Sequence, residues 1–367
     1  MKKIKILMIL HRTPPIHGAG KVGDFIGSSQ KLNREFNCKF ITIKSSSTIN
    51  DIGKVDIKKI YLLIELYIKV ALSLILFRPD KIYFTSSIRS VALYRDLLIS
   101  TLFKGYKLFK KTDIYYHYHT KGVNQFVSTT PRNLKLTNFF LKDINLILLS
   151  PPLSYDFKKI TTYKKILYLP NGVEDNYVAN QFENYISKKK FNKINILYLS
   201  NMIKAKGYFE VLKLAKYKRD RDIHFHFAGA WQNAQDEIDF FDYIKKNSLE
   251  KNVTFHGFIN GKEKRELFER SHLFIFPTLY INEAFPLSIL EALSYGLPTI
   301  STDEGSIPYI IDNKSGIICS NLNNLPKALD EGLDRLINIE TAIYCRERYL
   351  DNFSLKRFEN SLIEILS

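Results

Sequence analysis

The stretch that decides the fold is LFIFPTLYINEAFPLSILEALSYGLPTIST, which runs from Leu273 to Thr302. Its first four residues are apolar and precede Pro277, which has no backbone N–H to donate and predicts that a short strand ends there. A helical apolar pattern begins after Pro286 and ends at Gly296, a residue type that commonly terminates helices. A second short apolar run follows. Strand, loop, helix and strand in this order form the repeating unit of a parallel sheet.

Two glutamates occupy this loop and helix. Glu283 lies in the loop, and Glu291 lies inside the helix, with seven residues between them. Loops at the carboxyl ends of parallel strands bind ligands in open α/β sheets, and a helix N-terminus offers N–H groups to phosphate. Carboxylates repel bare phosphate, so we expect these two to face hydroxyls, and a nucleotide sugar carries both groups. On spacing alone, a solvated Glu291 and a capping Glu283 remain an equal alternative.

The run EAFPLSILEALSYGLPTI, which begins at Glu283, resembles the signature of retaining glycosyltransferases of family 4. The resemblance implies that Glu283 lies near the donor sugar and that Glu291 binds the nucleotide ribose. It also implies that backbone amides around Phe285, Leu287 and Ser288 hold the diphosphate.

The length of 367 residues exceeds what one core usually supports, so two domains are predicted. The resemblance implies an α/β fold with GT-B architecture, in which two doubly wound, Rossmann-like domains face each other across a cleft. We expect an acceptor-binding domain over residues 1–173, a lysine-rich linker over 174–193, a nucleotide-sugar-binding domain over 194–345, and a final helix within 346–367 that crosses back to the first domain.

The formal charge of +17 calls for a polyanionic neighbour. The lysines are widely spread and no recognition-helix, zinc-finger or RNP pattern occurs, so we expect no nucleic-acid partner. An anionic membrane surface fits the charge, and coding bias toward lysine remains the alternative. The three cysteines are far apart, which fits a reducing cytosol. The N-terminal apolar run is short and lacks a cleavage site, so it is interpreted as the first buried strand.

The most apolar run extends from Ile60 to Phe77, and Glu65 and Lys69 interrupt it at the spacing of a helical ion pair. A membrane span carries few charges. We therefore predict a buried or membrane-facing amphipathic helix rather than a span.

The loop after the first strand, residues 4–10, contains Gly18 and Gly20, and a helix is predicted from Val22 to Phe36. Glycines let the backbone approach a ligand closely. The sequence GAGK lacks the Ser or Thr of a P-loop. The resemblance implies that this loop faces the donor phosphates and the acceptor.

A strand is predicted from Asp113 to His119, and its period of two places His117 and His119 on one face. The resemblance implies a histidine beside the reaction centre at this position. We choose His119, with His117 as the runner-up. A histidine pair on a surface strand is the alternative.

The second domain is expected to open with a strand from Ile194 to Ser200 and a helix after Gly207. Lys206 matches the lysine that relatives place before this glycine, and it would neutralise phosphate. Asn201 stands near the position where relatives have arginine. This departure weakens one cationic clamp or leaves it to Lys204.

Two further strand ends are assigned to the donor side. The strand ending at Ala228 runs into Gly229, and the strand ending at His256 precedes Phe258. The resemblance implies that the loop carrying Phe258 packs against the nucleobase, and a core aromatic is the alternative.

One DxD pattern, Asp220 and Asp222, precedes a strand and is interpreted as a solvated turn at the amino end of the sheet. There is no HExxH motif. We therefore expect neither a metal nor another cofactor. After the signature, relatives often carry a proline-glutamate pair, whereas this chain has Pro308 and Tyr309.

The expected activity is transfer of a sugar, with retention, from a UDP- or GDP-sugar to a glycan or lipid-linked glycan. The acceptor would be a bacterial O-antigen, capsule or lipopolysaccharide, made at the cytoplasmic face of the inner membrane. The expected catalytic residues are His119, Lys206 and Glu283. The alternatives are a non-catalytic nucleotide-sugar-binding or scaffold subunit and a transferase with a soluble acceptor.

Overall fold

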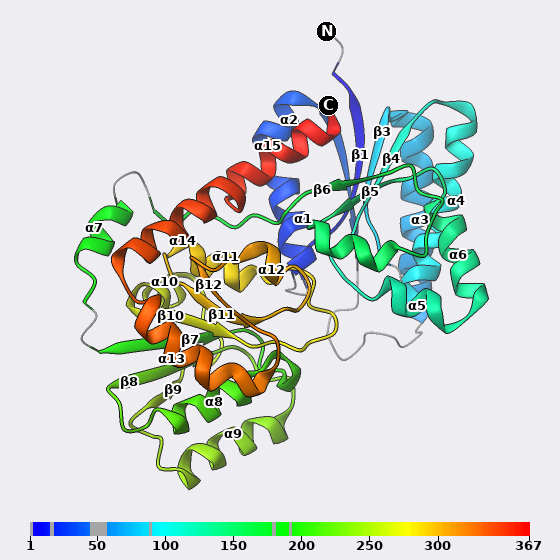
Figure 1. The fold of residues 1–367 in the computed structure, drawn as a ribbon. Coiled ribbons are helices and arrows are strands. Elements are labelled where there is room, and N and C mark those ends of the chain that lie inside the picture. Colours follow the sequence, from blue (N-terminus) through cyan, green and yellow to red (C-terminus); the bar gives the residue numbers. More distant parts are fainter. Residues whose placement is uncertain (1–2, 15–17, 45–56, 88–89, 178–180, 191–192) are drawn as a thin grey trace. The chain divides into compact units, whose positions relative to one another are not determined.

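The computed structural model describes residues 3–14, 18–44, 57–87, 90–177, 181–190 and 193–367. The chain forms two compact units (Figure 1). Unit 1 comprises Met1–Asn171 together with Phe358–Ser367, and unit 2 comprises Gly172–Arg357. Unit 2 is therefore one continuous segment, whereas unit 1 is built from both ends of the chain.

Unit 1 is organised around a six-stranded sheet in which every neighbouring pair of strands is parallel. Parallel strands require crossover connections, and helices supply most of them here. The strand order is β2 (Asn37–Ile43), β1 (Lys5–His11), β3 (Lys81–Thr85), β4 (Asp113–His117), β5 (Asn145–Leu148) and β6 (Lys165–Tyr168).

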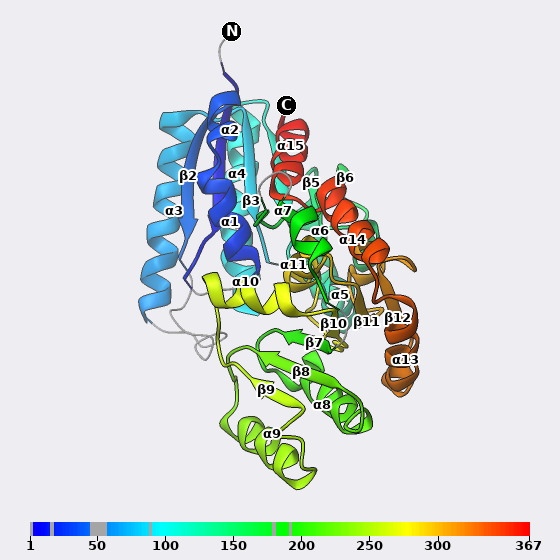
Figure 2. The same cartoon turned by 90° about the vertical axis from the view of Figure 1, so that its left-hand side faces the viewer.

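Helices cover both faces of this sheet (Figure 2). Alternate strand residues such as Ile9 and Phe84 share one buried cluster with residues of α3, α4, α5 and α6. The intervening residues, such as Met8, are buried on the other face. The helices of unit 1 are α1 (Gly18–Ser28), α2 (Gln30–Glu35), α3 (Ile57–Phe77), α4 (Ser90–Phe109), α5 (Val123–Thr129) and α6 (Pro131–Leu141), with the 3₁₀ helix η2 (Pro151–Phe157).

The last helix, α15 (Leu355–Leu366), adds three buried side chains to unit 1: Phe358, Leu362 and Leu366. Lys81 at the start of β3 donates to the carbonyl oxygens of Leu366 and Ser367 at 2.7 and 2.8 Å. The C-terminal segment thus adds buried apolar side chains to unit 1 and is joined to β3 by hydrogen bonds.

Unit 2 also contains a six-stranded parallel sheet. Its strand order is β12 (Gly316–Cys319), β11 (Thr299–Thr302), β10 (Leu273–Phe276), β7 (Ile194–Leu199), β8 (Ile223–Ala228) and β9 (Val253–Phe255). The surrounding helices are α7 (Gln181–Ser187), α8 (Tyr208–Tyr217), α9 (Ala234–Lys246), α10 (Gly261–Arg270), α11 (Leu287–Ser294), α12 (Ile307–Ile310), α13 (Leu325–Arg335) and α14 (Ile339–Asn352), with the 3₁₀ helices η3 (Lys204–Lys206) and η4 (Leu322–Asn324).

These two sheets confirm the predicted α/β fold with two doubly wound, Rossmann-like units. Several details differ from the sequence expectations. The helix expected from Val22 to Phe36 is divided, because the Ser29 side chain accepts a hydrogen bond from the Leu32 N–H and caps a separate α2. The stretch expected to be a linker, 174–193, contains α7, whose residues Phe182 and Ile186 are buried.

A candidate donor site in unit 2

The candidate site lies where the direction of chain winding changes in the sheet of unit 2. Strands β7 and β10 are neighbours. The chain leaves β7 toward β8 on one side, and it leaves β10 toward β11 on the other side. Such a topological switch point is where open α/β sheets bind ligands, outside the carboxyl ends of the strands.

The loops after β7 and β10 are joined at their backbones. The Leu279 N–H donates to the Ala205 carbonyl at 2.8 Å. Gly207 has φ of +85°, and a Cβ atom there would lie 2.3 Å from the Pro277 carbonyl oxygen. Only glycine fits this position, because a side chain would force the loops apart.

This junction brings two of the predicted residues together. The Lys206 ammonium lies 3.1 Å from the Glu283 carboxylate, and their side chains are 17% and 11% exposed. The same ammonium lies 5.4 Å from the centroid of the Tyr280 ring, over its face. Burial, followed by the nearby Glu283 charge, raises the pKa of Tyr198 well above its usual value. Lys206 and Glu283 therefore form a largely enclosed ion pair at the switch point.

The backbone around Glu283 is fixed from the loop after β11. Gly305 has φ of +58°, and a Cβ there would lie 2.2 Å from the Glu283 carbonyl oxygen. The Ser306 N–H donates to the Ala284 carbonyl at 2.9 Å. Sequence reasoning did not identify Gly305 as a site residue; its signal was a glycine in the loop that follows a strand.

Helix α11 starts directly after this loop. Pro286 precedes it, and Leu287 and Ser288 form its first turn, as the stretch from Leu273 to Thr302 predicts. The first N–H groups of an α-helix have no partner within the helix and form a positive end. Phe285, whose backbone amide is predicted to hold the diphosphate, has a buried ring. This ring faces the Phe353 ring, with 6.1 Å between the two centroids.

Glu291 points to a different partner from that of Glu283. Its Oε1 lies 2.6 Å from the Nζ of Lys264 on α10, and both side chains are about one-fifth exposed. This contact excludes the fully solvated alternative for Glu291. Sequence reasoning missed Lys264, because a contact between two different helices leaves no spacing signal.

The predicted residues after β7, β8 and β9 lie at the same edge of the sheet. Gly229 donates its N–H to the Gly257 carbonyl at 2.8 Å, and a Cβ at Gly229 would lie 1.7 Å from the Ser200 carbonyl oxygen. Asn201 is exposed, and Phe258 is 58% exposed, so the core-aromatic alternative for Phe258 is wrong. Its contact with a nucleobase stays a prediction.

In unit 1, strand β4 ends at His117 rather than at His119. The centroids of the His117 and His119 rings lie 4.0 Å apart, which agrees with the prediction that both side chains share one face of the strand. His117 is fully buried, forms a hydrogen bond with the Tyr83 hydroxyl at 2.5 Å, and has a pKa lowered well below its usual value by burial. His119 is partly exposed, but both of its ring nitrogens are buried, so its place beside the reaction centre stays a prediction.

The loop after His119 is held by a carboxylate of η2. Asp156 accepts hydrogen bonds from the backbone N–H groups of Gly122, Val123 and Asn124 at 2.6 to 2.9 Å. These are the amides at the start of α5. They are therefore already occupied by an anionic group of the chain itself.

The glycines of the first loop differ from expectation. Gly18 and Gly20 lie in the first turn of α1 rather than in an irregular loop, and a Cβ at Gly18 would have open space around it. The close approach is at Gly23, where a Cβ would lie 1.8 Å from the His11 carbonyl oxygen. The requirement for glycine at Gly23 comes from packing of α1 against the end of β1.

The DxD pattern lies away from this site. Asp220 and Asp222 immediately precede β8, at the amino edge of the sheet, and their side chains are 92% and 72% exposed. This agrees with a solvated turn. Across the described parts of the chain, there is no group of three or more His, Cys, Asp or Glu residues arranged to hold a metal ion.

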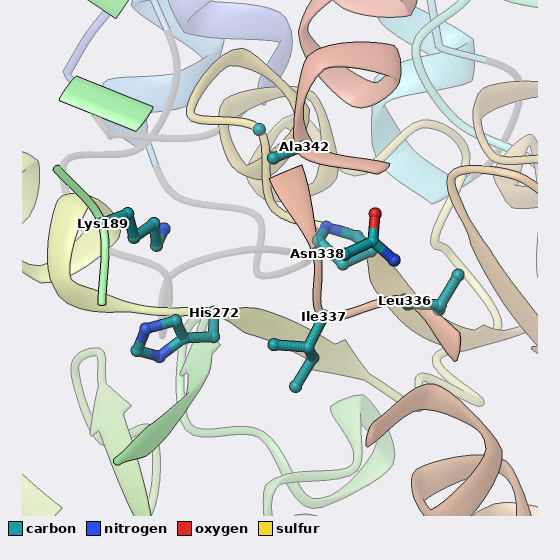
Figure 3. Close-up of a pocket in the computed structure, with 8 residues that line it drawn as sticks. Lys189, His272, Leu336, Ile337, Asn338 and Ala342 are labelled. Atoms are coloured by element: carbon teal, nitrogen blue, oxygen red, sulfur yellow. The ribbon is translucent and has the colours of Figure 1, made fainter. Parts of the chain in front are cut away.

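A small cavity in unit 2 is also separate from the candidate site (Figure 3). It is lined by residues that include Lys189, His272 and Asn338. His272 precedes β10, so the cavity opens at the amino edge of the sheet, opposite the candidate site. Burial lowers the pKa of Lys189 to about 7.

The match to a protein-family model lies in unit 2. Residues 181–350 match the family model described as "Glycosyl transferases group 1". A relative from Klebsiella pneumoniae, an "uncharacterized 41.2 kDa protein in cps region", is 28% identical over 187 residues, which is 50% of this chain and 48% of that protein. The chain spans between 28% and 57% of the length of the curated relatives that it matches.

Two solved structures resemble the whole chain. A glycosyltransferase from Rickettsia africae has a TM-score of 0.73 at 17% identity, covering 100% of this chain and 98% of that one. Anabaena Alr3699/HepE in complex with UDP has a TM-score of 0.70 at 14% identity, covering 100% and 99%. At these identities, the likenesses establish the fold.

Proposed function

Since unit 2 carries a glycosyl transferases group 1 domain over residues 181–350, we propose that the protein transfers a sugar from a nucleotide diphosphate sugar to an acceptor hydroxyl. The observation that carries the proposal is the Lys206–Glu283 pair beside the start of α11 at the β7/β10 switch point. A cation, a carboxylate and free helix amides are the groups needed to hold phosphate and sugar hydroxyls next to each other.

The departing diphosphate is negative, and its stabilisation sets the rate of such a transfer. The first amides of α11, at Leu287 and Ser288, point toward the space beyond the helix start and would bind phosphate oxygens. Lys206 would add a full positive charge. Donor binding would draw the Lys206 ammonium away from Glu283 and toward the phosphates.

Glu283 would then accept hydrogen bonds from donor-sugar hydroxyls. Its carboxylate is nearly buried, so a hydrogen bond to it is stronger than one in water. Glu291, held by Lys264, would accept from the ribose hydroxyls. The exposed ring of Phe258 would stack on the base.

We propose retention at the anomeric carbon, with His119 beside the reaction centre, and chemistry that needs no metal ion. Lys206 and the α11 amides supply the positive charge that a metal supplies elsewhere. His119 would act as a hydrogen-bonding group, with its ring 4.0 Å from that of the buried His117 between centroids.

The proposed donor is a UDP- or GDP-sugar, and the complex of the similar Anabaena structure with UDP supports the first of these. The proposed acceptor is a growing surface glycan, such as capsule, O-antigen or lipopolysaccharide, which the relative from a cps region supports. A lipid-linked glycan would be met at the cytoplasmic face of the inner membrane.

A panel of UDP-, GDP- and ADP-sugars tests the donor assignment through thermal unfolding, because a ligand that binds only the folded state raises its Tm. We expect one nucleotide series to raise Tm, and Glu291→Ala to reduce that rise. Detection of free sugar or glycosylated acceptor then separates a transferase from a non-catalytic nucleotide-sugar-binding subunit. The absence of any stabilising nucleotide would contradict the proposal.

A further inference from the structure

Helix α3 carries large apolar side chains on its outer side as well as on the side that is buried. Leu66, Val70 and Leu74 face the core of unit 1 and are at most 6% exposed. The opposite side carries Ile60, Ile64, Ile68, Leu72 and Leu76, each at least 50% exposed. A helix that covers the core of a water-soluble domain normally presents polar residues on its outer side.

The five exposed residues recur at intervals of four, so they form one stripe that turns by about 40° at each step. From Ile60 to Leu76 the stripe is about 24 Å long at a rise of about 1.5 Å per residue. Tyr61 and Ile75 are each 67% exposed and lie within the same half of the helix surface. We call this set of seven residues the α3 stripe.

The neighbouring helix α4 continues this character. Its exposed side chains include Tyr94 and Leu98, and at its C-terminal end Leu108 and Phe109 are 84% and 90% exposed. Contiguous apolar surface on this scale marks an interaction site rather than ordinary solvent-exposed surface.

The charge of the same helix layer indicates the kind of partner. Helices α3, α4 and α6 together contain eight Lys and Arg residues and two acids, Glu65 and Asp96. Asp96 is fully buried beside Arg95, and Glu65 is paired with both Lys69 and Lys44. Both acids are thus already paired, and by sequence the three helices carry a net positive charge.

We propose that the α3 stripe lies in the interface of an anionic lipid bilayer, with the helix axis parallel to the membrane plane. An apolar helix face bordered by Lys and Arg inserts between headgroups while the basic residues meet acidic lipids. The net charge of +17 acts in the same direction. This surface binding does not depend on the transferase activity proposed above.

Two other arrangements fit the structure less well. The segment Ile60–Phe77 is long and apolar enough to cross a membrane by length and composition, but a crossing would remove Leu66, Val70 and Leu74 from the core. A second copy of this chain packed symmetrically on the stripe would place the same basic residues against each other.

Flotation of the full chain with vesicles tests the proposal without any donor or acceptor. We expect binding to vesicles with about one-third anionic lipid to exceed binding to neutral vesicles at least tenfold, and to weaken with salt. The variant Ile64→Ser/Ile68→Ser/Leu72→Ser should lose at least tenfold of this binding. A matched control, Ile238→Ser/Ile343→Ser/Leu350→Ser, alters similarly exposed residues of unit 2 and should bind within twofold of the parent.

A tryptophan placed by Tyr61→Trp reports on depth, since brominated acyl chains quench only an indole that enters the bilayer. Quenching of this indole, with Trp231 unquenched, supports insertion of the α3 stripe.

Equal flotation of the stripe variant and the parent would overturn the proposal. So would a mass that doubles with concentration in the parent but not in the stripe variant, because a second copy would then cover the stripe. Resistance to alkaline carbonate extraction would indicate a spanning helix and would also overturn it.

Discussion

The Lys206 ammonium lies 3.1 Å from the Glu283 carboxylate and links the loop after β7 to the loop after β10. Lys206 and Glu283 are far apart in the sequence, so sequence spacing does not predict this contact. The pair sets two largely buried, opposite charges beside each other. The Glu283 carboxylate also positions the Lys206 ammonium. The phosphates of a donor would compete with this carboxylate for the ammonium.

Replacing Lys206 with methionine should lower kcat/KM at least 100-fold, because the leaving diphosphate loses its charged partner. The change also leaves Glu283 unpaired, so the free energy of unfolding should fall by about 2 kcal/mol. Lys213→Met is the matched control, since Lys213 is an exposed residue of α8 paired with Glu210. Urea unfolding and steady-state kinetics measure both effects. A parental rate in Lys206→Met would place the phosphate partner elsewhere.

Replacing Glu291 with alanine should weaken binding of the nucleoside diphosphate about tenfold to 100-fold, because two ribose hydroxyls lose an acceptor. Titration calorimetry with the nucleotide that raises Tm measures this change. Glu266→Ala on α10 is the control, because its side chain is 59% exposed and pairs with Lys262 on the same helix. Unchanged affinity in Glu291→Ala would remove Glu291 from the ribose site.

Replacing Gly305 with alanine should reduce transfer more than it reduces folding. Its φ is +58°, and the new Cβ would lie 2.2 Å from the Glu283 carbonyl oxygen, so the Glu283 loop must move. Gly261→Ala is a matched control: its φ is +50°, but the space around it is open, so it should cost only about 1 kcal/mol of backbone strain. Equal activity in the two variants would show that the Glu283 loop tolerates displacement.

Stability should fall on acidification below about pH 6.5. Burial lowers the pKa of His226 to about 3 and that of His256 to about 4, with the Arg270 charge as the next cause for both. Their rings form a hydrogen bond at 3.1 Å. The unfolded chain binds protons near pH 6.5 while the folded chain does not, so the free energy of unfolding decreases from there toward the folded pKa values.

Each such histidine contributes a slope of up to about 1.4 kcal/mol per pH unit within this window, and none above it. Urea unfolding at pH 7.5, 6.0 and 5.0 measures the slope. His226→Gln should make it shallower between pH 6.5 and 5.0. A slope that is the same in the variant and the parent would mean that His226 is protonated in the folded chain.

The stretch from Leu273 to Thr302 was predictable almost residue by residue, for local reasons. Pro277 ends β10, the apolar spacing after Pro286 gives α11, and Gly296 at φ of +69° ends that helix. The strands predicted over residues 4–10, over 194–200 and up to Ala228 also lie close to β1, β7 and β8, because buried parallel strands are continuous apolar runs between turn residues. Strand β12 was not predicted.

What sequence reasoning could not supply depends on contacts between distant segments. The partner of Glu291 is Lys264 on another helix, and the need for glycine at Gly23 arises from the carbonyl of His11. Helix α4 was not predicted, because its apolar residues are dispersed over most of its surface. The exposure of Phe258 could not be predicted, because an aromatic residue after a strand can lie either in the core or on the surface.

The assembly of unit 1 from both ends of the chain has a consequence for biosynthesis. Unit 2 is continuous, so its sheet can close as soon as the ribosome has delivered Gly172–Arg357. Unit 1 stays incomplete until Phe358–Ser367 follow, because Phe358, Leu362 and Leu366 belong to its buried residues and Lys81 donates hydrogen bonds to the carbonyls of Leu366 and Ser367. The segment made first is therefore the one that matures last.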